Sequence, residues 1–222
     1  MAGRPASPRS KPLLRGVSHE IAAGVALAGL VALVLLAPGP RARAAALVYG
    51  GSLVALFSVS ALYHRPDWSP RALLWMRRLD HSAIFLLIAG TFTPLCLLLG
   101  DAFARTMLAV VWAGAGAGIL RALLWPRAPR AVATSLYVLL GWAAVPLAPA
   151  MYRALGPGSM ALLAGGGLLY SVGAVIYATR WPDPFPRVFG FHEIFHLLVI
   201  AAAACHFLVV DAALGAMRPI VP

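Results

Sequence analysis

Residues 79–99, LDHSAIFLLIAGTFTPLCLLL, decide the fold class. The block is almost wholly apolar, and its one acidic residue, Asp80, lies at its start. A helix of about 20 residues, rising ~1.5 Å per residue, crosses the ~30 Å hydrocarbon core of a bilayer. The block does not alternate polar and apolar residues, and an open sheet would leave unpaired backbone groups in lipid. We therefore predict a membrane-spanning α-helix.

The rest of the chain has the same character. Hydrophobic residues make up 61% and charged residues 11% of its 222 positions, whereas soluble domains are about 45–50% apolar. Similar blocks recur at 17–37, 44–63, 104–124, 131–150, 157–178 and 189–210. We predict an all-α membrane protein whose residues 17–211 form a seven-transmembrane helix bundle. Residues 1–16 are predicted to be a disordered basic tail, and residues 212–222 a short C-terminal tail.

The net charge of +11 reports membrane topology rather than nucleic-acid binding, because the basic residues are scattered through loops and form no basic helix. Alternate connections carry 13 and 5 of the 18 basic residues. The larger set is Arg4, Arg9, Lys11, Arg15, Arg65, Arg71, Arg77, Arg78, Arg121, Arg127, Arg130, Arg180 and Arg187. Because basic residues near span ends stay in the cytoplasm, we expect the N-terminus inside, the C-terminus outside, and a multi-pass protein of the inner (plasma) cell membrane.

The first apolar block has an alternative interpretation as a signal peptide. It follows a basic start, and Ala42-Arg43-Ala44 resembles a small-residue cleavage site. Its apolar run exceeds the usual signal core of ~7–15 residues, and its removal would leave six spans. We therefore prefer a first transmembrane helix.

Ionisable residues gather at one depth of the predicted bundle. Ser60 and His64 lie one turn apart at the inner end of the second span, Asp80 opens the third, and His192 and His196 open the seventh. The topology places all of these helix ends at the cytoplasmic face. Because ionisable groups at membrane depth are costly, this shared depth indicates a functional site.

The histidine spacing predicts a zinc site. His192 and His196 are four residues apart, so one helix face presents both imidazoles to a single ion. His64 is the candidate third ligand, and three histidines with an open fourth position are a known catalytic zinc arrangement that lowers the pKa of water toward ~7. Asp80 could accept the proton of that water, and Ser60 could hold the water or polarise a substrate carbonyl.

Three segments carry a resemblance to a known family: 58–64 (SVSALYH), 78–85 (RLDHSAIF) and 189–196 (FGFHEIFH), followed by Cys205-His206-Phe207. They resemble bacterial hemolysin III proteins, a group within the PAQR family, which includes adiponectin and progestin receptors and is related to alkaline ceramidases. Over essentially all seven spans, the resemblance implies an inward N-terminus and zinc held by His64, His192 and His196, with Ser60 and Asp80 beside its water. Val17-Ser-His-Glu20 matches the family only loosely, so His19 and Glu20 receive no role.

The predicted function is zinc-dependent hydrolysis of membrane lipid amides or esters, with a role in membrane homeostasis. The lipid follows from the position of the site among apolar helices, and the ceramidase relationship suggests an amide by analogy. One alternative is an intramembrane metalloprotease, because His192-Glu193-x-x-His196 fits H-E-x-x-H with Glu193 as general base. Others are a receptor-like protein with a structural zinc and a pore-forming protein, although no helix shows a continuous polar stripe. His81 and His206 are expected to be buried hydrogen-bonding residues, and the oligomeric state stays open.

Overall fold

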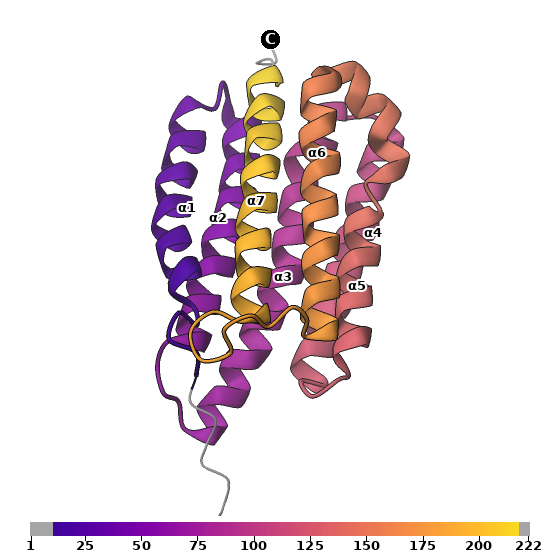
Figure 1. Cartoon of the computed structure of the whole chain (residues 1–222). Helices are drawn as coiled ribbons and strands as arrows, with labels where there is room; N and C mark the ends of the chain where they lie inside the picture. Colours follow the sequence, from indigo (N-terminus) through magenta and orange to yellow (C-terminus); the bar gives the residue numbers. More distant parts are fainter. Residues whose placement is uncertain (1–10, 218–222) are drawn as a thin grey trace, which may run out of the picture.

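A computed structural model describes residues 11–217, so the first ten residues of the predicted tail and the last five of the chain lie outside it. The described chain is helical and contains no β-strand, which confirms the all-α prediction (Figure 1). Its elements are α1 (Val17–Leu36), α2 (Pro40–His64), α3 (Pro70–Leu99), α4 (Ala102–Leu124), α5 (Arg130–Trp142), the 3-10 turn η1 (Val145–Leu147), α6 (Ala148–Thr179) and α7 (Phe191–Ala216).

Local sequence signals set several helix ends. Ser69 caps α3 by accepting a hydrogen bond from the Ala72 backbone N–H at 3.4 Å, and Asp101 caps α4 by accepting one from Ala104 at 2.7 Å. Gly100 ends α3 in the left-handed conformation (φ 68°), which glycine adopts without steric cost. The short turn between α3 and α4 therefore follows directly from the sequence.

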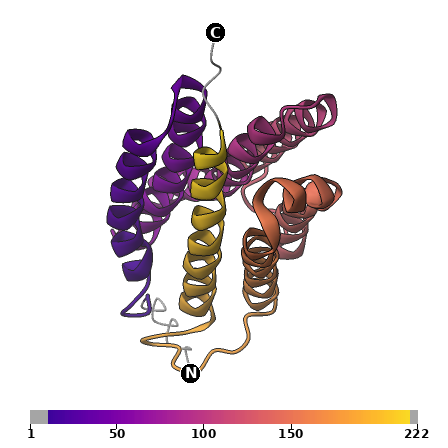
Figure 2. The ribbon, with the colours of Figure 1, turned by 90° about the horizontal axis from the view of Figure 1, so that it is seen from above.

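The helices run up and down, so alternate connections lie at the same end (Figure 1). Residues 11–16 and the α2–α3, α4–α5 and α6–α7 connections lie at one end, which we call the basic end, and α7 finishes at the other. Helix α7 contacts α1, α2, α3 and α6, and it lies between α1 and α6 when the bundle is viewed along its axis (Figure 2). The first turns of α7 therefore face several helices at the basic end.

Within residues 11–217, six helical stretches are long and apolar enough to cross a membrane. Together with the predicted pattern of apolar blocks, they identify a multi-pass membrane protein. One stretch, Arg130–Thr179, has 50 residues, about twice the ~20 that one crossing needs. Figure 1 shows that it rises as α5 and returns as α6.

Helix α5 ends at Trp142, before the end of the fifth predicted span, 131–150. Pro146 lies in η1, since proline lacks a backbone N–H and disfavours helical geometry in the residue before it. Gly156 then interrupts α6 with φ 76° and ψ 178°, immediately before Pro157. Helix α7 also continues to Ala216, past residue 211 where the predicted domain ends.

Two apolar clusters hold the bundle together. The first joins α1, α2, α3 and α7 around side chains such as Tyr49 and Phe57, and the second joins α3, α4, α6 and α7 around Phe85 and Val111. Helices α3 and α7 contribute to both clusters. Polar groups at the basic ends of these two helices are therefore fixed by packing on several sides.

Candidate metal centre

Three histidines from two helices meet at the basic end. His64 is the last residue of α2, and His192 and His196 lie in the first two turns of α7. One ring nitrogen of each lies within 4.8 Å of the other two. The Nε2 atoms of His64 and His192 are 3.1 Å apart. The histidines singled out by spacing and depth are thus brought together by the fold.

The geometry of the cluster fits a metal ion. Two nitrogens that each lie ~2.0–2.1 Å from a tetrahedral zinc are about 3.3 Å apart, close to the 3.1 Å observed between His64 and His192. The Nδ1 atom of His196 is buried and has no hydrogen-bond partner in the described chain. Burying such a nitrogen without a partner is unfavourable, and an imidazole set of this kind suits zinc and other transition metals.

A fourth histidine, His19 of α1, lies against the three-histidine cluster, although the sequence analysis assigned it no role. Its side chain is 3% exposed, and its ring stacks on His196 with centroids 3.7 Å apart and an interplanar angle of 7°. Its Nδ1 is 2.8 Å from the Ser60 hydroxyl. His19 lies at the same helix-end depth as the other histidines, and that depth alone could have identified it. Its neighbour Glu20 instead pairs with Arg65 at 3.0 Å in an exposed position.

Ser60 and Asp80 lie beside the three-histidine cluster but supply no atom to it. Ser60 is buried one turn before His64 in α2. Asp80 lines the same cavity as the histidines and Ser60. Within residues 11–217, the group of potential ligands contains the three histidines and no carboxylate. Both residues therefore line the same cavity as the three histidines.

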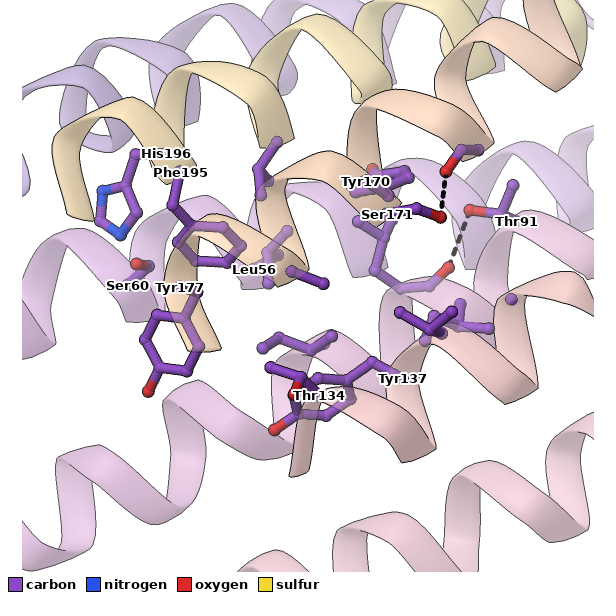
Figure 3. A pocket seen from close by; sticks show the side chains of 18 of the residues that line it. Leu56, Ser60, Thr91, Thr134, Tyr137, Tyr170, Ser171, Tyr177, Phe195 and His196 are labelled. Atoms are coloured by element: carbon purple, nitrogen blue, oxygen red, sulfur yellow. Dashed lines mark hydrogen bonds between the residues drawn. The ribbon is translucent and has the colours of Figure 1, made fainter. Parts of the chain in front are cut away.

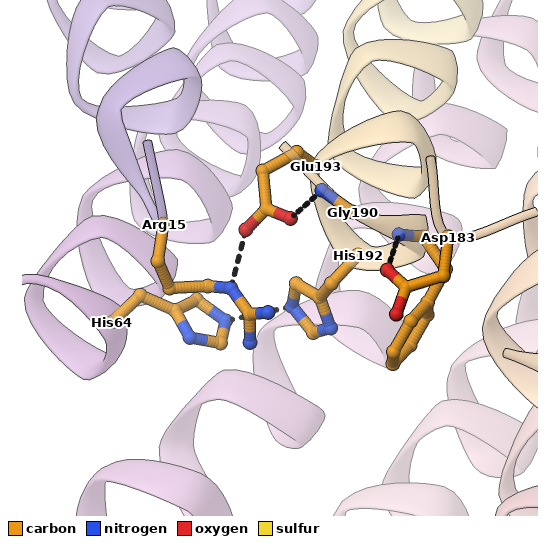
Figure 4. A network of polar contacts seen from close by, with 7 residues as sticks. Arg15, His64, Asp183, Gly190, His192 and Glu193 are labelled. Atoms are coloured by element: carbon orange, nitrogen blue, oxygen red, sulfur yellow. Dashed lines mark hydrogen bonds and ion pairs between the residues drawn. The ribbon is translucent and has the colours of Figure 1, made fainter. Parts of the chain in front are cut away.

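Both carboxylate oxygens of Glu193 have a hydrogen-bond partner (Figure 4). One carboxylate oxygen pairs with the Arg15 guanidinium, and the other accepts a hydrogen bond from the Gly190 backbone N–H at 2.7 Å. The second contact caps the start of α7. Asp183 accepts a further bond from the Phe191 backbone N–H at 3.0 Å. The first turn of α7 is therefore fixed by two carboxylates.

The chain before α1 lies across the basic end. Lys11 pairs with Asp67 at 2.9 Å and donates to the Pro66 carbonyl at 2.6 Å, both in the α2–α3 connection. The backbone N–H of Leu13 donates to the carbonyl of Arg187 in the α6–α7 connection at 3.0 Å. Residues 11–15, which the sequence assigned to the disordered tail, are thus attached to two connections and to α7.

A cavity of about 560 Å³ leads from the histidines into the bundle. It is mostly apolar and lies between α3, α5, α6 and α7, with His196 and Ser60 at one end and Thr91 at the other (Figure 3). Asp80 and Leu95 both line it, and fifteen residues of α-helix span about 22 Å. A chain-like apolar ligand could lie along it.

The remaining histidines make hydrogen bonds, as predicted. His206 approaches the Leu163 carbonyl at 3.2 Å through Nε2, and His81 approaches the Tyr137 hydroxyl at 3.1 Å through Nδ1. Neither is part of the three-histidine cluster. They are suitable controls for substitutions of the ligand histidines.

Sequence comparison with known proteins identifies the family of this chain. A model of the Haemolysin-III related family matches residues 8–207. The chain belongs to the haemolysin III family. Hemolysin-3 of Bacillus cereus is 33% identical over 200 residues, covering 88% of each chain. The Hemolysin-3 homolog of Bacillus subtilis (strain 168) is 29% identical over 199 residues, covering 88% of this chain and 90% of the relative.

The similarity extends beyond bacteria. Human monocyte to macrophage differentiation factor is 30% identical over 166 residues, covering 72% of this chain and 66% of the relative. The haemolysin III match includes every residue of the metal centre, from His19 to His196. The family assignment made from the three sequence segments is therefore confirmed.

Proposed function

We propose that this haemolysin III protein is a zinc-dependent hydrolase of lipid amides or esters that contributes to membrane homeostasis. The observation that carries the proposal is the meeting of a three-histidine cluster with a long apolar cavity. His64, His192 and His196 would hold the ion. When bound there, zinc supplies a Lewis acid and makes water nucleophilic near neutral pH.

The surrounding residues have distinct roles in this hydrolysis. Asp80 accepts a proton from the attacking water and returns it to the leaving amine or alcohol. The Ser60 hydroxyl donates to the carbonyl oxygen of the substrate. If His19 Nδ1 carries the proton and donates to Ser60 Oγ, Ser60 keeps its own proton for that carbonyl. The stacked His19 ring also holds His196 in its orientation.

The proposal includes seven crossings of the plasma membrane with the basic end in the cytoplasm. Support comes from the 50-residue stretch Arg130–Thr179, which runs out and back. Its α5 part has 13 residues and covers about 20 Å, so η1 and the start of α6 complete the crossing. The excess of basic residues at the connections of the basic end supports its cytoplasmic position.

The engaged Glu193 carboxylate favours lipid hydrolysis over the metalloprotease alternative. A general base of the H-E-x-x-H type needs a free carboxylate oxygen near the attacking water. Both oxygens of Glu193 are already bonded, to Arg15 and to the N–H of Gly190. Asp80 lines the cavity and is available for that role.

The Asp80→Asn variant tests the proposal. Purified protein is incubated with long-chain lipid amides and esters, the released fatty acid is quantified by mass spectrometry, and zinc is measured in the same sample. We expect Asp80→Asn to keep its zinc and lose at least 100-fold in fatty-acid release, because it cannot take the proton. Asp211→Asn, an exposed change of the same kind in α7, should behave as wild type.

Two results would contradict the proposal. Full activity of Asp80→Asn would remove Asp80 from the reaction. No release by wild-type protein that contains zinc would favour the receptor-like alternative with a structural metal. Lipid profiles of cells that carry or lack the protein provide the corresponding cellular measurement.

A further inference from the structure

Cations gather where the cavity meets the basic end. Four basic side chains line it: Lys11, Arg15, Arg77 and Arg130. The first two are each paired with a carboxylate. Within residues 11–217, no carboxylate lies within 4.0 Å of the guanidinium of Arg77 or Arg130. The acidic residue that lines this part of the cavity is Asp80. The wall therefore carries more positive than negative charge.

Arg130 is held in a defined orientation. Its guanidinium carbon lies 5.0 Å from the centre of the Tyr177 ring and 5.7 Å from that of Phe191. Such cation–π contacts orient a guanidinium without using its N–H groups. The Nη1 atom is buried and has no hydrogen-bond partner in the described chain. A buried N–H donor without an acceptor is costly, so this group is suited to a ligand that brings an acceptor.

Membrane topology alone does not account for this arrangement. Basic residues that only mark the cytoplasmic side extend toward water and headgroups. Arg127 fits that description, because it is exposed and does not line the cavity. Arg130 lies in the first turn of α5, where the helix dipole disfavours a cation. A positive charge at this position therefore does not stabilise α5.

Arg130 is separated from the three-histidine cluster by a single aromatic side chain. The Tyr177 ring, over which Arg130 stacks, has its centre 5.7 Å from that of His192. One aromatic ring thus separates the guanidinium from the three-histidine cluster, and Figure 3 shows Tyr177 at the His196 end of the cavity. If the headgroup of a lipid placed an anionic group at Arg130, the amide or ester bond beside that headgroup would lie near the histidines. The lipid chain would then lie in the apolar part of the cavity.

We propose that the substrate of this site is a lipid with a phosphate-bearing headgroup, which Arg130 binds with help from Arg77. Guanidinium groups bind phosphate oxygens through paired, charge-assisted hydrogen bonds. The inference depends on the proposed lipid hydrolysis, whose apolar cavity receives the lipid chain.

Binding of two matched lipids tests the inference without turnover. Both are single-chain glycerol ethers of equal chain length, which lack the amide or carboxylic ester bond that the proposed reaction cleaves. One carries a phosphate monoester and the other a free hydroxyl. We expect wild-type protein in detergent to bind the phosphate lipid at least about tenfold more tightly than the hydroxyl lipid. This ratio of dissociation constants corresponds to one charge-assisted hydrogen bond. Arg130→Gln should remove most of this preference and leave binding of the hydroxyl lipid unchanged.

Arg127→Gln is the matched control, since it makes the same charge change three residues away and should retain the preference. Arg77→Gln should lower the preference partly, and it replaces Arg130→Gln if that variant does not fold. Equal binding of both lipids by wild type, unaltered in Arg130→Gln, would overturn the headgroup inference and leave lipid hydrolysis standing. Binding of neither lipid would count against the lipid-binding cavity itself. Displacement by inorganic phosphate at concentrations similar to those of the lipid would assign the site to free phosphate and overturn the lipid assignment.

Discussion

Glu193→Gln separates a structural carboxylate from a catalytic one. The Glu193 side chain is 4% exposed and that of Arg15 is 20% exposed. The carboxylate accepts one hydrogen bond from Arg15 and one from the Gly190 N–H. Glutamine has one acceptor oxygen, so it can keep one of these bonds and must lose the other together with the charge.

The cost of this change can be estimated. Losing a hydrogen bond to a charged group costs ~1.5–3 kcal/mol, and breaking a fully buried ion pair costs ~3–5 kcal/mol. Because Arg15 retains access to water, we expect a value near the lower range, about 2 kcal/mol. For a chain of this size, 1 kcal/mol shifts the Tm by ~2–4 °C, so Glu193→Gln should lower it by about 4–8 °C.

Glu20→Gln is the matched control, because Glu20 forms an exposed pair with Arg65, with side chains 58% and 47% exposed. Such surface pairs contribute ~0–1 kcal/mol, so its Tm should change little. The assay follows tryptophan fluorescence of detergent-solubilised protein during heating, with zinc content and fatty-acid release measured at 25 °C. Glu193→Gln should retain its zinc and stay within about threefold of wild-type activity. An unchanged Tm with a loss of activity of ~100-fold or more would refute this reasoning and make Glu193 the general base.

Three further substitutions or fusions probe other parts of the molecule. His19→Ala should keep zinc but lower fatty-acid release by about tenfold or more, because Ser60 loses the partner that orients it; loss of zinc would instead make His19 a ligand. Thr91→Phe fills the far end of the cavity, so fatty-acid release from long-chain lipids should fall while release from short-chain lipids persists. Equal effects on both lipids would contradict the assigned path of the lipid chain. Reporter fusions after Arg15 and after Pro222 should place the first in the cytoplasm and the second outside; both ends on one side would exclude seven crossings.

Features with a local cause could be predicted from the sequence. The apolar blocks give the helices, because each is long enough to cross a bilayer. His192 and His196 share a helix face through their spacing, and the topology predicted from the basic residues places them at the same depth as His64. The family segments could also be recognised directly, since they are contiguous.

Features that depend on tertiary packing could not. Arg15 and Glu193 are 178 positions apart, and no pattern in the sequence links them. The cavity results from the spacing of several helices rather than from any one block. The early end of α5 is different, because it has a local cause in Pro146 that the hydropathy of the block does not show. His19 received no role because its segment matches the family only loosely, and its stacking on His196 depends on how α1 packs against α7.

Metal content of the purified protein tests the three-histidine site most directly. Wild type, His196→Ala and His206→Ala are purified gently in detergent without chelator. The number of zinc ions per chain is then measured by inductively coupled plasma mass spectrometry. We expect one zinc per chain in wild type and in His206→Ala, and a marked loss in His196→Ala, because only that change removes a ligand. Near-zero zinc in wild type, or undiminished zinc in His196→Ala, would contradict the proposed metal centre.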